Sequence, residues 1–339
     1  MAANAQLNPF SDMRTHAGSE HRPETGGVAE ISYADTSQVL TKATGFMDAY
    51  DFTLNPYSGC GFGCTYCYAA FFARDAEKRD NWGYWVNVKQ NAVELLSRPR
   101  QQSKLDGALI YMSSVTDAYQ PVERELGMTR GLLEIMAYGS VQDPNAVEPT
   151  QASMFAESTP TRYAASGHAP RLVVQTRSPD VTRDIDLFQQ IKENGGKVQV
   201  NMTVTTDDET VRKTFEPSCP SNARRIDAIR QVHEADVQAC VTLTPLIWAN
   251  DAEVFAQRLL DTGIERFIIQ PFKFTSGKFV AQTRQGALKL MADLLDCSPH
   301  PQAIEHSYMQ RYQRDFSVIK DMLGDNLVGE AKEGFKPPF

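Results

Sequence analysis

Residues 55–74 read NPYSGCGFGCTYCYAAFFAR, and three of the chain's six cysteines fall within this stretch. Cys60, Cys64 and Cys67 have the spacing C-x3-C-x2-C. Thiolates are soft ligands that suit iron–sulfur clusters, so three on one tight loop can hold three irons of a [4Fe–4S] cubane. The fourth iron is then open to a small ligand. The interspersed glycines let the backbone curl around a cluster, because glycine tolerates positive φ.

Two other sites explain this stretch less completely. A structural zinc site needs a fourth cysteine or histidine at a suitable spacing, but Phe71 and Phe72 follow the motif instead. A thioredoxin-like site needs only C-x-x-C, which Cys64 and Cys67 satisfy, and this leaves Cys60 and the glycines without a role. The remaining cysteines are far apart in the sequence, so a second cluster is not evident: Cys219, Cys240 and Cys297.

The composition predicts a folded cytoplasmic protein. Hydrophobic residues make up 42% of the 339 residues, which is enough for a sizeable core. There is no apolar run of about 18 residues, and residues 1–27 contain no signal-peptide stretch, so we expect no membrane span and no export. The formal net charge of −8 argues against a protein that coats nucleic acid, although it leaves room for a local basic groove.

Short segments rich in β-branched residues alternate with helical patterns after residue 50. Alternation of this kind predicts parallel strands joined by helical crossovers, and six units favour an α/β fold: an open six-stranded (β/α)6 partial TIM barrel. The strand segments are 51–56, 108–112, 171–176, 198–204, 239–244 and 266–270.

The domain organisation follows from this alternation of strand and helix patterns. We expect a flexible polar arm over residues 1–45, the partial barrel over 46–280 and a helical extension over 281–339. Residues 140–170 interrupt the barrel with an aperiodic stretch rich in Ala, Ser and Pro, which is typical of a long inserted loop that acts as a lid or a docking surface.

The cysteine stretch and three later blocks resemble the radical S-adenosylmethionine (radical SAM) proteins related to spore photoproduct lyase. The blocks are SSVTDAYQPVERE (113–125), VVQTRSPDVTRDIDLF (173–188) and VNMTVTTDDETVRKTFEPSCPSNARRIDAIR (200–230). The resemblance implies that the open iron of the cluster binds S-adenosylmethionine. It also implies reductive cleavage of this cofactor to a 5′-deoxyadenosyl radical that abstracts hydrogen from a substrate. The electron would come from a donor such as flavodoxin or ferredoxin.

The resemblance also suggests residues around the cofactor, most of them at the carboxyl ends of the second, third and fourth strands. Tyr66 lies where the superfamily places an aromatic residue near the adenine. Polar residues after the strands would reach the methionine amino group, the ribose and the carboxylate, and Arg177 and Arg212 are the cationic candidates for the carboxylate. The other candidates are Ser113, Ser114, Thr116, Asp117, Gln175, Asn201 and Thr203.

One departure from the lyase concerns its hydrogen-donating cysteine, which follows the second strand. Here no cysteine lies between Cys67 and Cys219, so Tyr111, Tyr119 or Cys219 are the candidate hydrogen donors, or the reaction differs. Three functions stay open at this point. They are an enzyme acting on a small molecule or a nucleic-acid base, an enzyme that modifies a peptide or protein, and a non-catalytic iron–sulfur protein.

Overall fold

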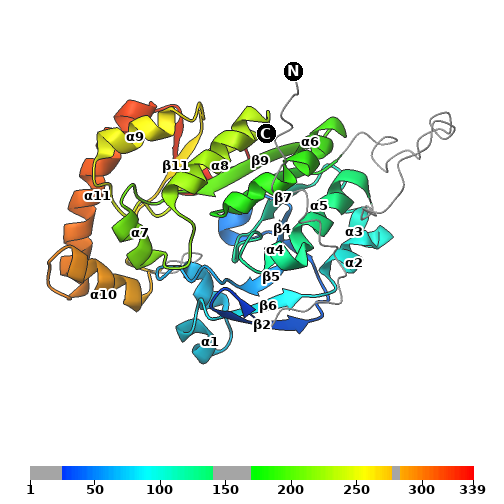
Figure 1. Ribbon diagram of the computed structural model, residues 1–339, viewed down its shortest axis with the longest axis horizontal. Coiled ribbons are helices and arrows are strands. Elements are labelled where there is room, and N and C mark those ends of the chain that lie inside the picture. The colour runs from blue at the N-terminus through cyan, green and yellow to red at the C-terminus, as the bar shows by residue number, and fades with distance from the viewer. Residues whose placement is uncertain (1–24, 140–168, 277–282) are drawn as a thin grey trace, which may run out of the picture.

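A computed structural model of the protein describes residues 25–139, 169–276 and 283–339 (Figure 1). Its centre is an open eight-stranded sheet with the order β12-β11-β10-β9-β8-β7-β4-β3. Neighbouring strands from β12 to β4 are parallel, and β3 pairs antiparallel with β4. The strands are β3 (Leu40–Lys42), β4 (Phe52–Leu54), β7 (Leu109–Met112), β8 (Arg171–Thr176), β9 (Lys197–Thr203), β10 (Gln238–Leu243), β11 (Phe267–Ile269) and β12 (Val328–Glu330).

All six segments expected to be strands form, as β4, β7, β8, β9, β10 and β11. The expected count of six is too small, because one strand is added at each edge of the sheet. β12 comes from the segment predicted to be helical and hydrogen-bonds to β11, while β3 comes from the predicted arm. Three-residue strands carry little periodic signal, so only tertiary pairing reveals them.

Helices connect the parallel strands and cover one face of the sheet (Figure 1). α8 and α6 lie on this face beside α5, and α9 packs on the long helix α11. The connecting helices are α4 (Glu123–Leu126), α5 (Met128–Tyr138), η3 (Pro179–Asp184), α6 (Ile185–Glu193), α7 (Glu209–Phe215), α8 (Asn222–Glu234) and α9 (Ala252–Leu260). The C-terminal segment contains α10 (Gln285–Leu294), α11 (Pro301–Leu323) and α12 (Ala331–Gly334).

The two faces of the sheet bury different side chains. Leu172 and Val174 of β8 belong to the large hydrophobic core beneath the helices. Val173, which points to the other face, joins a small cluster with Tyr50 and Tyr111 that Phe335 covers. The chain end therefore covers part of this second face, since the Tyr50 hydroxyl also donates to the Phe335 carbonyl at 3.0 Å.

A second, four-stranded sheet carries the cysteine loop, and the sequence did not predict it. Its order is β1-β2-β6-β5, and it includes residues that we assigned to the flexible arm. β5 ends directly before Cys60, so this sheet holds the start of the cysteine loop in place. The strands are β1 (Thr25–Gly26), β2 (Ala29–Ala34), β5 (Tyr57–Gly59) and β6 (Trp85–Lys89).

Short helices connect the strands that precede β7: η1 (Gly45–Met47), η2 (Tyr68–Phe72), α1 (Ala76–Asp80), α2 (Ala92–Ser97) and α3 (Pro99–Gln102). Most of the predicted insertion, residues 140–170, lies outside the described residues. Among the described helices, none combines the length and the apolar character that crossing a membrane requires.

Candidate active site

The loop between β5 and η2 carries the three motif cysteines. Cys60 and Cys64 are buried and Cys67 is half-buried. Tight turns close the loop, since Gly63 N donates to Cys60 O at 3.2 Å and Cys67 N donates to Cys64 O at 3.1 Å. Gly63 has a φ of +60° and lies against the backbone of Gly83, so a side chain there is strained and crowded. The glycines of the motif thus permit the compact loop that three neighbouring thiols require.

The loop that follows β7 holds the cysteine loop from the other side. Gly61 N donates to Gln120 Oε1 at 2.8 Å, and the hydroxyl of Thr116 donates to Gly59 O at 2.5 Å. These bonds tie the residues on both sides of Cys60, at the start of the cysteine loop, to one short segment after β7. Thr116 was predicted to contact the cofactor. In the structure its hydroxyl instead holds the cysteine loop by hydrogen-bonding to Gly59 O.

Ser114 lies at the same junction. Its hydroxyl accepts from Asn55 Nδ2 at 3.2 Å, and its carbonyl accepts from the hydroxyl of Tyr68, which directly follows the last motif cysteine. Asn55 Oδ1 in turn accepts from Val115 N at 3.2 Å. β4, β7 and the start of η2 are therefore joined by polar contacts around one serine, which stays half-buried.

The three thiols need not converge on one point to hold a cluster. Among the described residues, no group of three His, Cys, Asp or Glu side chains could hold one metal ion. A cubane does not need such convergence, because each thiolate binds a different iron. Burial, and after it the negative charge of Asp117, raises the pKa of the Cys60 thiol well above its usual range. A cationic iron centre would offset this cost, as metals deprotonate coordinating thiols.

Cys219 is the fourth thiol at this site. Its Sγ lies 3.6 Å from Cys64 Sγ and 3.8 Å from Phe62 O, although it is 155 positions further along the chain than Cys64. Arg212 fixes the turn that carries it, donating from Nη1 to Cys219 O at 2.7 Å and to Glu216 O at 3.1 Å. The Arg212 guanidinium is buried and also pairs with Glu209 at 2.6 Å, so its donors hold the protein's own backbone.

A buried carboxylate, Glu216, is the electrostatic centre of the site. Its Oε2 pairs with Arg225 Nη2 at 2.6 Å, and its Oε1 pairs with Arg177 Nη1 at 2.9 Å. Oε1 also accepts from the hydroxyls of Tyr66 at 2.5 Å and Thr205 at 2.8 Å. Burial acts to raise the pKa of Glu216, but the charges of Arg225 and Arg177 outweigh it and lower this pKa to about 2.

Two of the predicted cofactor residues meet in this network. Arg177 Nη1 lies 3.0 Å from the Tyr66 hydroxyl, and the guanidinium carbon is 5.9 Å from the centre of the Tyr66 ring. Among the described residues, Arg177 Nε and Nη2 have no hydrogen-bond partner in this arrangement. The Arg177 side chain is 15% exposed, so one edge of its guanidinium remains available to an anion beside the cysteine loop.

The loop after β7 is also attached to the end of β8. Ser113 has a φ of +72°, and its hydroxyl accepts from Ala118 N at 2.8 Å. The buried carboxylate of Asp117 accepts from the Thr176 hydroxyl at 2.7 Å and from Arg177 N at 2.9 Å. Burial raises the pKa of Asp117, and these hydrogen bonds oppose the rise. Both residues shape the loop, and Asp117 directs the backbone from which Arg177 projects.

The remaining predicted polar residues line the same face of the main sheet as Val173 and hydrogen-bond to one another. Gln175 Oε1 accepts from the Tyr111 hydroxyl at 2.8 Å and from Asn201 Nδ2 at 3.3 Å. Gln175 Nε2 donates to the hydroxyls of Thr203 at 2.8 Å and Thr242 at 3.0 Å. One amide thus connects four parallel strands. This interior amide network brings together four residues that the sequence singled out.

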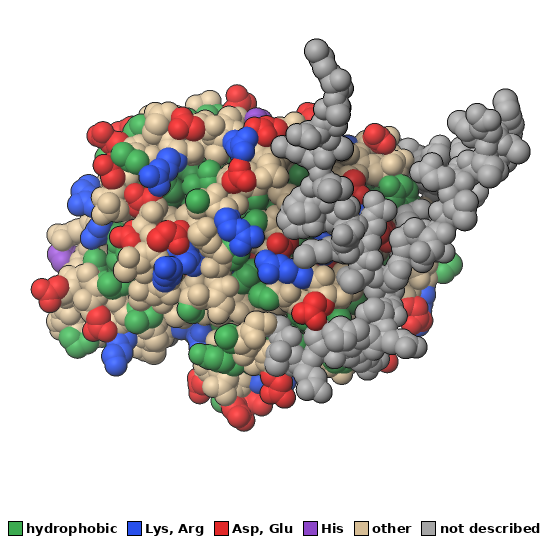
Figure 2. All heavy atoms as spheres, viewed as in Figure 1, with side chains coloured by type: hydrophobic (Ala, Val, Ile, Leu, Met, Phe, Trp, Pro, Cys, Tyr) green, Lys and Arg blue, Asp and Glu red, His purple; other side chains and the backbone are tan. Residues whose placement is uncertain are grey.

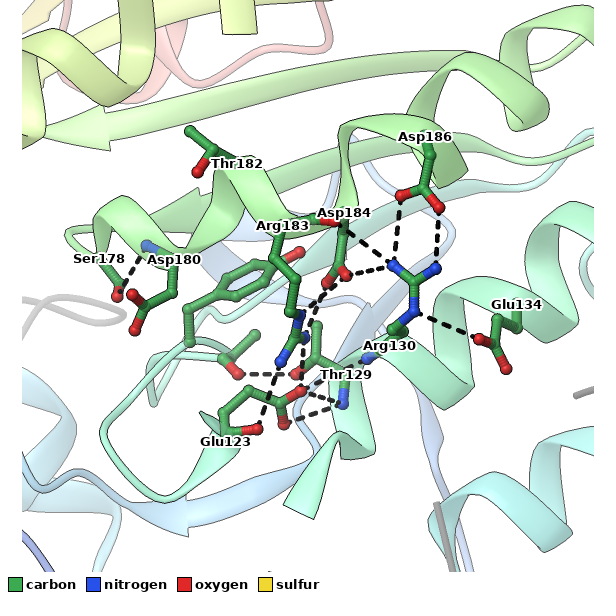
Figure 3. Close-up of polar contacts among 12 residues, drawn as sticks. Glu123, Thr129, Arg130, Glu134, Ser178, Asp180, Thr182, Arg183, Asp184 and Asp186 are labelled. Carbon is green, nitrogen blue, oxygen red and sulfur yellow. Dashed lines mark hydrogen bonds and ion pairs between the residues drawn. The ribbon is translucent and has the colours of Figure 1, made fainter. Parts of the chain in front are cut away.

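Tyr119, another predicted hydrogen donor, lies in a different environment. It is fully buried, with its ring 5.7 Å from the Arg183 guanidinium carbon. Arg183 bridges Glu123 and Asp184, each at 2.8 Å, and Asp184 also pairs with Arg130 at 2.9 Å. Figure 3 shows these charges between α4–α5 and η3–α6, where they join the helices that cover the sheet. Tyr119 therefore packs on a structural ion network.

The sequence did not single out Glu216, Arg225 or Gln120. A buried acid between two arginines has no spacing signature, because Arg177 lies 39 positions before Glu216. Glu216 and Arg225 do fall within EPSCPSNARR, part of the block that resembles the lyase-related proteins. The charged residues of that block were the available signal for a buried ion pair, since Glu and Arg are rarely buried unless they are paired.

Part of the chain is similar to known proteins. Residues 54–255 match the family described as the Radical SAM superfamily. An uncharacterized protein of Methanocaldococcus jannaschii is 30% identical over 196 residues, which cover 58% of this chain and 60% of that protein. An uncharacterized protein of Acidianus two-tailed virus is 24% identical over 230 residues, covering 63% of this chain and 64% of that protein. The chain thus spans less than two thirds of either relative.

Two solved structures show partial similarity to this chain. A spore photoproduct lyase is 13% identical, with a TM-score of 0.47 over 90% of this chain and 87% of that one. A radical S-adenosylmethionine methyltransferase from Kitasatospora setae is 12% identical, with a TM-score of 0.41 over 64% of this chain and 35% of that one. Since the family match covers more than half of the chain and includes all three motif cysteines, the protein belongs to the radical SAM superfamily.

Proposed function

We propose that this protein is an enzyme that uses a [4Fe–4S] cluster on Cys60, Cys64 and Cys67 to cleave S-adenosylmethionine reductively. When bound, this pair of cofactors supplies a 5′-deoxyadenosyl radical, which would abstract hydrogen from a substrate. The observation that carries the proposal is the compact cysteine loop, clamped by the segment after β7 and bordered by the free edge of Arg177. The proposed frame is a partial barrel over residues 46–280, and residues outside this range add β3 and β12 to its sheet.

Within this function, the chain's own residues have separate tasks. Arg177 would bind the carboxylate of the cofactor with its free Nε and Nη2, since a guanidinium can grip a carboxylate with two hydrogen bonds. Glu216 would keep Arg177 oriented and charged, and Tyr66 would pack near the adenine. Asp117 would act through the loop rather than by direct contact, since its oxygens already accept hydrogen bonds.

The interior amide network would line the space where cofactor and substrate meet. Its residues alternate along parallel strands, and inward-facing residues near strand carboxyl ends form the sites of barrel enzymes. Tyr111 is the proposed hydrogen donor on this face, because its hydroxyl is aligned by Gln175. Cys219 is the competing candidate, because its thiol lies at the cysteine loop.

A single assay tests the proposal. Anaerobically reconstituted protein with dithionite and S-adenosylmethionine should release 5′-deoxyadenosine, measured by chromatography, and flavodoxin or ferredoxin should replace dithionite. A non-catalytic iron–sulfur protein would retain its iron but would release no 5′-deoxyadenosine. Release of 5′-methylthioadenosine would preserve the cluster assignment and refute the deoxyadenosyl-radical mechanism.

A further inference from the structure

The contact between Cys219 and Cys64 joins a cysteine outside the motif to one of the three proposed cluster ligands. Their Sγ atoms are 3.6 Å apart, which is close enough for an S–H···S hydrogen bond. A disulfide bond is about 2.05 Å long, so both side chains are free thiols. Cys64 is 4% exposed and Cys219 is 7% exposed, so little water competes for this contact.

The backbone on both sides holds the two thiols together. Thr65, the residue after Cys64, donates to Phe215 O from its N at 2.9 Å and from its hydroxyl at 3.2 Å. Cys219 N donates to Glu216 O at 3.1 Å, and the proline that follows Cys219 restricts its backbone. The turn after α7 is therefore attached to the cysteine loop directly beside Cys64, and the position of the Cys219 thiol is fixed by this attachment.

The direction of the hydrogen bond follows from ligation. A cysteine that binds iron does so as a thiolate and carries no proton, so Cys219 must be the donor and Cys64 the acceptor. The other acceptor near the Cys219 thiol is Phe62 O, at 3.8 Å. Cys64 Sγ is both the nearer acceptor and, as a ligand, the charged one, and hydrogen bonds to charged acceptors are the stronger ones.

Ligation by Cys219 itself is the alternative to donation. A [4Fe–4S] cubane takes one protein ligand for each of its four irons. The iron held by Cys64 then has no position for a second thiolate, and the fourth iron is the proposed site of the cofactor. Cys219 is thus placed to act on a ligand rather than to be one.

A hydrogen bond to a ligand sulfur favours the reduced cluster, because the added electron increases the negative charge on the sulfurs. Hydrogen bonds of this kind are among the factors that set the reduction potential of iron–sulfur clusters. On the face shown in Figure 2, acidic and basic side chains are interspersed, so their distant fields partly cancel. A buried dipole that contacts a ligand directly should therefore have a measurable effect.

We propose that Cys219 raises the reduction potential of the cluster by donating an S–H hydrogen bond to the Cys64 ligand. Cys219 is then a positioning residue, because it acts through Cys64 and does not touch the cofactor. Its effect is to let a weaker electron donor reduce the cluster. This inference rests on the proposed function for the presence of the cluster, but the potential can be measured without any turnover.

A redox titration of the anaerobically reconstituted protein, followed by the electron paramagnetic resonance signal of the reduced cluster, tests this role. Cys219→Ala should lower the reduction equilibrium constant by about three- to tenfold, the effect of one hydrogen bond. This change corresponds to about 30–60 mV for one electron. Cys219→Ser keeps a donor and should restore part of the shift. Cys297→Ala, the same change at a half-buried cysteine after α10, should leave the potential unchanged.

A second measurement detects the proton itself. In protein exchanged into D2O, electron–nuclear double resonance should show a deuteron coupled to the reduced cluster. This coupling should be missing in Cys219→Ala and present in Cys219→Ser and Cys297→Ala. An unchanged potential or an unchanged coupling in Cys219→Ala overturns the inference. Loss of iron from Cys219→Ala, with iron retained in Cys297→Ala, also overturns it, because Cys219 would then be needed to hold the cluster.

The release of 5′-deoxyadenosine, measured in parallel, separates this inference from the proposed function. If the parent holds a cluster whose potential depends on Cys219 but releases no 5′-deoxyadenosine, the proposed function fails and the role of Cys219 stands. If 5′-deoxyadenosine is released and the potential does not depend on Cys219, the function stands and the role fails. A parent protein that takes up no cluster overturns both.

Discussion

Replacement of Glu216 by glutamine should destabilise the protein strongly, because this change leaves two buried arginine charges without their shared partner. The Glu216 carboxylate is fully buried and contacts Arg225 and Arg177 at 2.6 Å and 2.9 Å. The gap between its ordinary pKa of 4.5 and a folded-state pKa of about 2 corresponds to about 3 kcal/mol. Breaking a buried ion pair from one side typically costs about 3–5 kcal/mol, which is consistent with this value.

The sign of the pH dependence follows from the lowered pKa. Stabilisation by the carboxylate is complete above about pH 4.5 and is lost as the pH falls toward 2. Protonated Glu216 and glutamine are both neutral, so the parent and Glu216→Gln should converge in acid. The difference in their free energy of unfolding should be about 3 kcal/mol at pH 7 and less than half of this at pH 3.

Urea unfolding followed by circular dichroism, at pH values from 7 to 3, measures the difference in the free energy of unfolding and its decrease in acid. The matched control is Glu234→Gln, which removes an exposed partner of Arg230 from the same helix, α8. This control should lose less than about 0.5 kcal/mol. The reasoning is refuted if both variants lose a similarly small free energy of unfolding. It is also refuted if the difference in this free energy between the parent and Glu216→Gln does not become smaller in acid.

Three further predictions concern the cysteine loop and its surroundings. Alanine at any motif cysteine should remove most of the iron from anaerobically reconstituted protein, whereas Cys219→Ala and Cys297→Ala should retain it in an iron assay. Arg177→Gln should weaken calorimetric binding of S-adenosylmethionine by about tenfold or more, the effect of one charge-assisted hydrogen bond, and unchanged affinity would remove Arg177 from the site. Gly59→Ala should cost more than about 2 kcal/mol in urea unfolding and reduce iron uptake, because its Cβ would lie 2.5 Å from Trp85 O. Gly107→Ala, with a similar φ of +63° but open space around it, should cost only the backbone strain of about 1 kcal/mol.

Local patterns were sufficient for six strands of the main sheet, and they also indicated the three cysteines that we propose as cluster ligands. β8 contains a core of β-branched and apolar residues and is flanked by Pro170 and Pro179. Its predicted bounds agree with those of the structure. The cysteine spacing is equally local, because three thiols within eight residues can face one cluster whatever the rest of the chain does. Short edge strands such as β3 and β12 have no such signature and exist only because a neighbour offers its hydrogen-bonding edge.

The sequence alone therefore indicated the family, six parallel strands and the cysteines proposed as cluster ligands, because each depends on residues close together in the chain. Only the tertiary structure decided which side chains face one another across long separations. It joined Glu216 to Arg177 and Arg225, and it brought Cys219 to Cys64. It also showed that Asp117, Thr116 and Arg212 hold backbone atoms in place. A polar residue's partners depend on loop paths and burial, and a one-dimensional pattern does not contain that information.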